Sequence, residues 1–243
     1  MGSTRLPGKV LKIVDGKNPS LYFTISQLKQ CKNIDKIIVA TTILKEDDII
    51  ENFAKNLGID VFRGSVEDVL DRYFQCANYF KINTIIRITG DCPLIDPLIV
   101  DRGIEIFQSE NYDYVTNTFP RTFPDGNETE IFSFNILKKA WENAILPSER
   151  EHVTPYFQNQ NFKIKNFENT IDNSHLRWTV DFPEDLQLVK TLISKIDSRP
   201  IHFEDILHLI KSEPELIEIN NDHEPNEGLK RSLEKDKDFL KNQ

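Results

Sequence analysis

Residues 36–63, KIIVATTILKEDDIIENFAKNLGIDVFR, carry the pattern that decides the fold. The run 36–42 is short, apolar and β-branched, as in a buried parallel strand. Residues 45–57 have the spacing of a helix, and Gly58 follows them as a stop signal. Residues 60–63 have the composition of a second short strand. A strand, a helix and another strand in this order predict a parallel βαβ unit.

The same alternation continues along the chain. Apolar residues at helical spacing predict helices over 66–80 and 97–109. Short β-branched runs predict strands over 84–88 and 112–116. The sequence therefore predicts an α/β fold with a mostly parallel central sheet and helices on both of its faces.

This alternation breaks after Asn117. Residues 118–127 have the composition of a loop, with two prolines and a glycine. Further on, we predict strands at 128–133, 162–167 and 176–180, and helices at 135–144, 149–159, 184–196 and 203–211. We expect one domain, residues 1–219, with an inserted substrate-side lobe over 118–175. The tail, 220–243, is rich in Asn, Glu and Lys, which predicts partial order at best.

Composition excludes several classes of protein. The chain has 243 residues and 39% hydrophobic residues, enough for a substantial core. No apolar run approaches the roughly 20 residues that a membrane span needs, and the polar, glycine-rich start of the sequence leads us to expect no signal peptide. Three widely spaced cysteines predict a reduced, cytoplasmic protein without a zinc cluster. The net charge of −9 argues against broad nucleic-acid binding, but a local cationic pocket could still bind a nucleotide.

The first eleven residues, MGSTRLPGKVL, have the composition of a phosphate-binding loop. They combine two glycines, two hydroxyl residues and two cations: Gly2, Gly8, Ser3, Thr4, Arg5 and Lys9. Free backbone N–H groups beside cations form a cradle for a polyphosphate. The spacing differs from a Walker A loop, because five residues separate the two glycines and Val10 follows the lysine.

Two other loops carry an aspartate directly after a predicted strand. These are residues 87–96, RITGDCPLID, which contain Asp91, and residues 177–185, RWTVDFPED, which contain Asp181. Ligands in open α/β sheets bind beyond the carboxyl ends of the strands, and two converging carboxylates can hold Mg²⁺. Either aspartate alone could be a turn or helix-cap residue. The three loops together favour a site.

At this level of detail the chain resembles the sugar and sugar-acid cytidylyltransferases. The nearest resemblance is to the family of spore-coat polysaccharide biosynthesis protein F, which is related to acylneuraminate and 3-deoxy-manno-octulosonate cytidylyltransferases. The matching stretches are 2–11, 62–65, 68–73, 87–97, 149–156, 174–185, 226–228 and 231–233. The resemblance therefore runs nearly from end to end, and it implies a Rossmann-like nucleotidyltransferase fold.

The resemblance also implies a reaction. An acceptor oxygen attacks the α-phosphorus of CTP, and pyrophosphate leaves. Arg5 and Lys9 would then hold the triphosphate, and Asp91 and Asp181 would hold Mg²⁺ as catalytic metal ligands. The acceptor is a small polar molecule such as a sugar acid, and related enzymes often form homodimers.

Two further groups of site residues follow from the resemblance. Contacts to the nucleotide are expected from Gly2, Ser3, Thr4, Arg63, Asp71, Arg72 and Arg87. Contacts to the acceptor are expected from Glu128, Glu130, Arg150, His152, Arg177 and Trp178. A simpler interpretation of residues 149–156 is a helix that carries an ion-pair network or faces a partner subunit. The stretch 126–130, GNETE, departs from the usual family pattern, so the acceptor could differ slightly.

The largest departure lies at the front of the chain. Members of this family have a strand before the GSTR motif, and that strand is central in the sheet. We expect that the natural protein starts upstream of Met1, through a start codon assigned too late or a truncation. Loss of such a strand would cost several kcal/mol of a typical total stability of about 5–15 kcal/mol.

Three other functions are compatible with parts of this pattern. A glycosyltransferase of similar architecture would release a nucleoside diphosphate, and it commonly has an Asp-x-Asp metal motif, whereas Asp91 is followed by Cys92 and Pro93. A non-catalytic remnant would bind CTP without turnover. A guanylyl- or uridylyltransferase would differ only in the base that it recognises.

Overall fold

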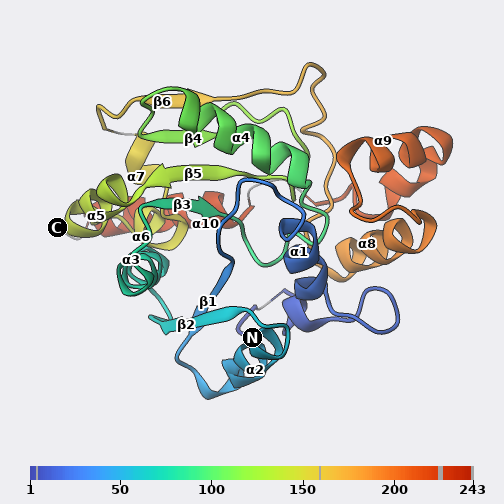
Figure 1. The fold of residues 1–243 in the computed structure, drawn as a ribbon, viewed down its shortest axis with the longest axis horizontal. Coiled ribbons are helices and arrows are strands. Elements are labelled where there is room, and N and C mark those ends of the chain that lie inside the picture. Colours follow the sequence, from blue (N-terminus) through green and yellow to red (C-terminus); the bar gives the residue numbers. More distant parts are fainter. Residues whose placement is uncertain (4, 159, 224–226, 242–243) are drawn as a thin grey trace.

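The computed structural model describes residues 1–3, 5–158, 160–223 and 227–241 (Figure 1). The helices are α1 (Ser20–Leu28), α2 (Asp48–Asn56), α3 (Val69–Phe80), α4 (Pro97–Ser109), α5 (Phe134–Asn143), α6 (Pro147–His152), α7 (Pro155–Gln158), α8 (Pro183–Lys195), α9 (Phe203–Ser212) and α10 (Glu227–Lys241). The strands are β1 (Ile38–Thr42), β2 (Asp60–Gly64), β3 (Thr84–Arg87), β4 (Tyr114–Thr116), β5 (Glu130–Ser133) and β6 (Ile164–Asn166). Short 3₁₀ helices cover Lys9–Leu11, Lys45–Asp47 and Pro214–Ile219. None of the described helices is long and apolar enough to cross a membrane.

The predicted βαβ unit is confirmed. Strands β1 and β2 pair in parallel from Ile38 opposite Asp60 to Thr42 opposite Gly64. Helix α2 connects them and packs on both. Gly58, at a φ of +71°, ends this connection in a left-handed conformation that glycine adopts without strain.

The other four strands form a second, mixed sheet in the order β3-β5-β4-β6. Strand β5 is antiparallel to both β3 and β4, whereas β4 and β6 are parallel. The prediction of a mostly parallel sheet is therefore only partly confirmed. Residues 118–175, expected as an inserted lobe, supply β5 to the interior of this sheet.

Alternating side chains join the mixed sheet to helices on both of its faces. Val115 and Ile131 pack into one core cluster with residues of α4, α8 and α9. Tyr114 and Phe132, one position away on the same strands, pack into a second cluster with residues of α3 and α5. This period-two pattern buries both faces of the sheet and confirms the predicted layers.

Two sequence predictions differ from the structure in the middle of the chain. The predicted strand at 176–180 is wrong, because the chain there makes only one isolated bridge, between Asp125 and Arg177. Its apolar residues are buried in the core without belonging to a ladder. The predicted helix at 149–159 is divided into α6 and α7 at Val153, which has a φ of +72°.

Two helices of the structure, α1 and α10, were not predicted from the sequence. Helix α1 buries seven of its nine residues, so it lacks the polar face that reveals an amphipathic helix. Within the tail, for which we expected partial order at best, residues 227–241 form α10 and pack against α6. Ser232 and Asp236 anchor α10 through buried hydrogen bonds, a type of signal that composition does not reveal.

A cavity separates the two sheets. In the described part of the chain, β1 pairs only with β2 and β3 only with β5, so the facing edges of β1 and β3 have no strand partner. Between these edges lies a cavity of about 360 Å³ with a mostly apolar lining from α1, β1, α3 and β3. The amino group of Met1 is paired with Asp47, whose carboxylate also accepts hydrogen bonds from Thr41 and Thr42 at the carboxyl end of β1.

We predict that a short β-forming extension joined to Met1 stabilises the fold. The extension would have about six residues with apolar side chains at alternate positions, and it would lead into Met1, which lies at the carboxyl end of β1. It would run parallel to β1 and fill the cavity between the edges of β1 and β3. A gain of several kcal/mol in the free energy of unfolding should raise the midpoint of thermal unfolding by roughly 5 °C or more, because each kcal/mol corresponds to about 2–4 °C in a chain of this size. Calorimetry against an equally long Gly/Ser extension tests this, and equal midpoints would contradict it.

Candidate active site

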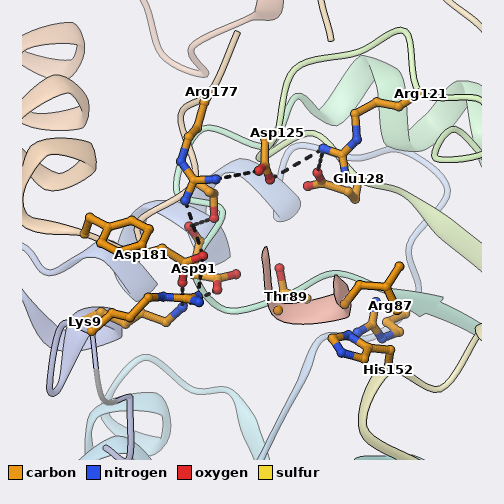
Figure 2. Close-up of a pocket in the computed structure, with 15 residues that line it drawn as sticks. Lys9, Arg87, Thr89, Asp91, Arg121, Asp125, Glu128, His152, Arg177 and Asp181 are labelled. Carbon is orange, nitrogen blue, oxygen red and sulfur yellow. Dashed lines mark hydrogen bonds and ion pairs between the residues drawn. The ribbon is translucent and has the colours of Figure 1, made fainter. Parts of the chain in front are cut away.

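The predicted loops meet at a pocket of about 280 Å³ (Figure 2). Its lining includes the opening loop, the loop after β3, the loop before α8 and the first turn of α10. The lining residues are Arg5, Lys9, Arg87, Thr89, Asp91, Arg121, Asp125, Glu128, His152, Arg177, Thr179, Asp181, Phe182, Gly228 and Leu229.

The ammonium group of Lys9 joins the two predicted aspartates. Lys9 Nζ lies 2.5 Å from Asp91 Oδ2 and 2.5 Å from Asp181 Oδ1. Gly8, at a φ of +68°, turns the chain into the 3₁₀ helix that begins at Lys9. Asp91 lies beyond the end of β3, and Asp181 lies two residues before α8. Three segments that are far apart in the sequence therefore converge on one cationic group.

Mutual attraction keeps this cluster charged in spite of burial. Burial raises the pKa of Asp91 and of Asp181, but the nearby Lys9 ammonium outweighs it, so both pKa values lie below the usual range. Burial lowers the pKa of Lys9, and the two carboxylates reverse that effect. All three groups are therefore ionised at neutral pH.

Arg5 completes the predicted catalytic set. Arg5 Nη2 lies 2.7 Å from Asp181 Oδ2, and its guanidinium lies over the ring of Phe182 at 5.1 Å from the centroid. The structure thus brings together Arg5, Lys9, Asp91 and Asp181. Two cations and two carboxylates in one half-buried cluster can bind a polyphosphate together with a metal ion.

Arg177 connects this cluster to the rest of the pocket. Its guanidinium makes two hydrogen bonds to Asp185, at 2.9 and 3.0 Å, and lies 2.7 Å from Asp125 and 3.3 Å from Asp181. Asp185 is fully buried. A residue predicted to bind the acceptor is therefore already held by three acidic side chains, which fix its orientation.

A second charged group lies beyond Arg177. Arg121 is paired with Glu128 and lies 3.5 Å from Asp125. Burial and the neighbouring Glu128 raise the pKa of Asp125 to about 8, although Arg121 and Arg177 oppose this shift. Carboxylates and guanidinium groups thus alternate along this wall, as Figure 2 shows.

Arg87 and His152 form the opposite end of the pocket (Figure 2). Arg87 donates to Glu130 and lies over the ring of Tyr73. Burial lowers the pKa of His152, so its imidazole is neutral at pH 7. Glu130 is buried behind Arg87, where it also accepts a hydrogen bond of 2.6 Å from Thr154, so it supports the pocket without lining it.

Several predicted site residues lie away from the pocket lining. In place of a ligand, the side chains bind the protein itself: Arg63 pairs with Asp48 and Glu51, Asp71 accepts from Trp141, Arg72 donates to the carbonyl of Ser65, and Arg150 pairs with Asp68. Trp178 is fully buried in the core. Gly2 and Ser3 precede the lining residues, and Thr4 lies outside the described residues. Their proposed contacts with a ligand remain predictions.

Seven lining residues were not predicted from the sequence. These are Thr89, Arg121, Asp125, Thr179, Phe182, Gly228 and Leu229. Thr89, Thr179 and Phe182 lie within two residues of the predicted aspartates, so proximity could have indicated them. Arg121 and Asp125 belong to a loop of mixed charge, and nothing local distinguishes them from surface residues. Gly228 and Leu229 reach the pocket only because α10 folds back onto α6.

The donor set fits a magnesium ion. Asp91 and Asp181 both reach one cationic position, the one that Lys9 Nζ shares with them. Mg²⁺ is commonly held by one or two carboxylates, and phosphate oxygens and water complete its shell. Among the described residues, no group of three or more His, Cys, Asp or Glu side chains is placed to hold a metal ion. A metal ion at Asp91 and Asp181 would therefore need phosphate or water oxygens to complete its shell.

The fold and the pocket define an α/β protein with a charged pocket beyond the carboxyl end of β3. A family model of cytidylyltransferases matches residues 1–221, so the chain belongs to the cytidylyltransferase family. It is therefore an enzyme of the nucleotidyltransferase class with the Rossmann-like fold that the sequence predicts.

Individual relatives agree with this assignment. The chain is 33% identical over 227 residues to the spore coat polysaccharide biosynthesis protein SpsF of Bacillus subtilis, a match that covers 88% of this chain and 92% of the relative. A solved cytidylyltransferase from Leptospira borgpetersenii superposes with a TM-score of 0.85 at 39% identity, covering 89% of this chain and 92% of that one. A 3-deoxy-manno-octulosonate cytidylyltransferase of Hydrogenovibrio crunogenus is 29% identical over 140 residues, 56% of this chain and 55% of its own.

We predict that Arg177→Gln strongly destabilises the fold. The substitution leaves the buried Asp185 without its cationic partner, and removal of one member of a buried ion pair costs about 3–5 kcal/mol. Urea denaturation measures this loss. The control is Lys190→Gln at an exposed position of α8, where the free energy of unfolding should change by no more than about 0.5 kcal/mol. Equal stability of the two variants would contradict the role assigned to Arg177.

Proposed function

We propose that the protein transfers CMP from CTP to a hydroxyl group of a sugar acid or a similar carboxylated acceptor and releases pyrophosphate. The product would be an activated precursor of a surface polysaccharide or glycoconjugate. One observation carries the proposal: in a cytidylyltransferase, two carboxylates and two cations from three distant loops converge in one pocket. The relatives named for spore-coat polysaccharide and for 3-deoxy-manno-octulosonate support the acceptor class.

The charged cluster suits the attack of an oxygen on a phosphorus atom. Arg5 and Lys9 would bind the triphosphate and offset the charge that develops on the departing pyrophosphate. Asp91 and Asp181 would hold Mg²⁺, which when bound neutralises phosphate charge and polarises the α-phosphate. Catalysis then consists mostly of positioning and charge neutralisation.

The acceptor would lie at the other end of the pocket, toward Arg87 and His152. Arg87 and Arg121 offer guanidinium groups for a carboxylate, since such groups bind planar anions in a bidentate manner. The neutral imidazole of His152 can accept a hydrogen bond from an acceptor hydroxyl. A cytoplasmic location and a homodimer belong to the same proposal.

We predict CTP-dependent release of pyrophosphate with a sugar acid as acceptor. A coupled pyrophosphate assay would test CTP, GTP and UTP against 3-deoxy-manno-octulosonate and N-acetylneuraminate. We expect turnover with CTP but not with GTP or UTP. Chelation of Mg²⁺ should abolish this turnover. Binding of CTP without turnover would instead identify a non-catalytic nucleotide-binding protein.

We also predict that Asp91→Asn and Asp181→Asn each lower turnover by about 10²–10³-fold, because each removes one anionic ligand of the proposed metal ion. Steady-state kinetics at varied Mg²⁺ would measure the loss, and circular dichroism would check the fold. The control is Asp197→Asn at an exposed position far from the pocket lining, which should retain full activity. Normal activity of both pocket variants would refute the metal assignment.

A further inference from the structure

The first turn of α10 forms part of the pocket wall. Gly228 and Leu229 line the pocket beside Arg87 and His152. Figure 2 shows this turn in the colour of the C-terminal helix, between Thr89 and Arg87. A Cβ atom added at Gly228 would lie 3.7 Å from Cε1 of His152, so the helix backbone approaches the imidazole closely.

Polar contacts hold α10 in this position. Ser232 Oγ lies 3.0 Å from Nε2 of His152 and donates a hydrogen bond of 2.8 Å to Glu151. One turn later, Asp236 accepts a hydrogen bond of 2.8 Å from the backbone of Ser148. Ser232 and Asp236 are buried. These contacts fix the helix on α6, so the place of Leu229 in the wall is set by the fold.

Helix α10 lies beyond the residues that the family model of cytidylyltransferases matches. The family model ends at residue 221, whereas α10 begins at Glu227. The cluster of Arg5, Lys9, Asp91 and Asp181 lies wholly inside the matched part. The family description names the cytidylyl group that its members transfer, but it does not name the acceptor. The wall that α10 supplies lies at the end of the pocket with His152, away from that cluster, and it is therefore suited to the acceptor.

We propose that Leu229 is a specificity-determining residue that bounds the acceptor at the end of the pocket remote from the reacting phosphate. This inference rests on the proposed function. Leu229 presents a half-buried apolar side chain to the pocket that the charged Arg87 and the neutral His152 also line. It limits the length of a hydroxylated carboxylic acid whose anionic group is bound by arginine, and it makes no contact with CTP.

Leu229→Trp tests this role because it enlarges the wall without removing a polar contact. The matched control is Leu233→Trp on the next turn of the same helix, where the side chain is 46% exposed. With whichever of 3-deoxy-manno-octulosonate and N-acetylneuraminate the wild type uses, Leu229→Trp should raise the acceptor KM about tenfold or more. The affinity for CTP should change less than about twofold, and Leu233→Trp should match the wild type. An unchanged acceptor KM, or an equal loss of CTP affinity, would overturn the proposal.

A second measurement decides the question without turnover. The introduced indole reports on its surroundings, and its emission is obtained as the difference between the Leu229→Trp and wild-type spectra. CTP with Mg²⁺ should leave this emission unchanged, because the nucleotide lies at the opposite end of the pocket. A shift on addition of CTP would place Leu229 beside the nucleotide and overturn the proposal. Failure of the wild type to use either acid would count against the proposed function, and the emission would still locate Leu229.

Discussion

The ammonium group of Lys9 is the interaction on which the pocket depends. It lies between the carboxylates of Asp91 and Asp181, which would otherwise repel each other in a buried place. An unpaired buried charge costs several kcal/mol, so the loops after β3 and before α8 can approach each other only with a cation between them. The opening loop supplies that cation. A divalent metal with a triphosphate would preserve the same balance of charge.

Around this cluster the pocket is organised as a set of shared ion pairs. Arg177 contacts Asp125, Asp181 and Asp185 at once, so it links the cluster of Lys9, Asp91 and Asp181 to the loop that carries Arg121. Each guanidinium is held by the protein before any ligand binds. Such preorganisation lowers the entropic cost of orienting a substrate, and it explains why so many charges are retained in a partly buried site.

Much of the fold follows from local patterns. The strand, helix and strand of residues 38–64 form as predicted, because a βαβ unit is encoded in consecutive segments. The antiparallel β5 was not predicted as such, since a strand's direction depends on where the preceding loop carries the chain. Helix α1 is buried nearly all round, so its sequence has no amphipathic period. Helix α10 is polar, and its order comes from docking on α6 rather than from propensity.

The sequence by itself determined the family, the α/β class and the four charged residues that meet in the pocket, because each of these residues lies in a short motif. Only the tertiary structure decided which other side chains reach the pocket. Arg63 and Arg150 are bound within the protein, whereas Arg121, Asp125 and Leu229 line the site. The physical reason is that these placements depend on the docking of distant segments, whose free energy comes from burial and ion pairing between parts of the chain that no local pattern connects.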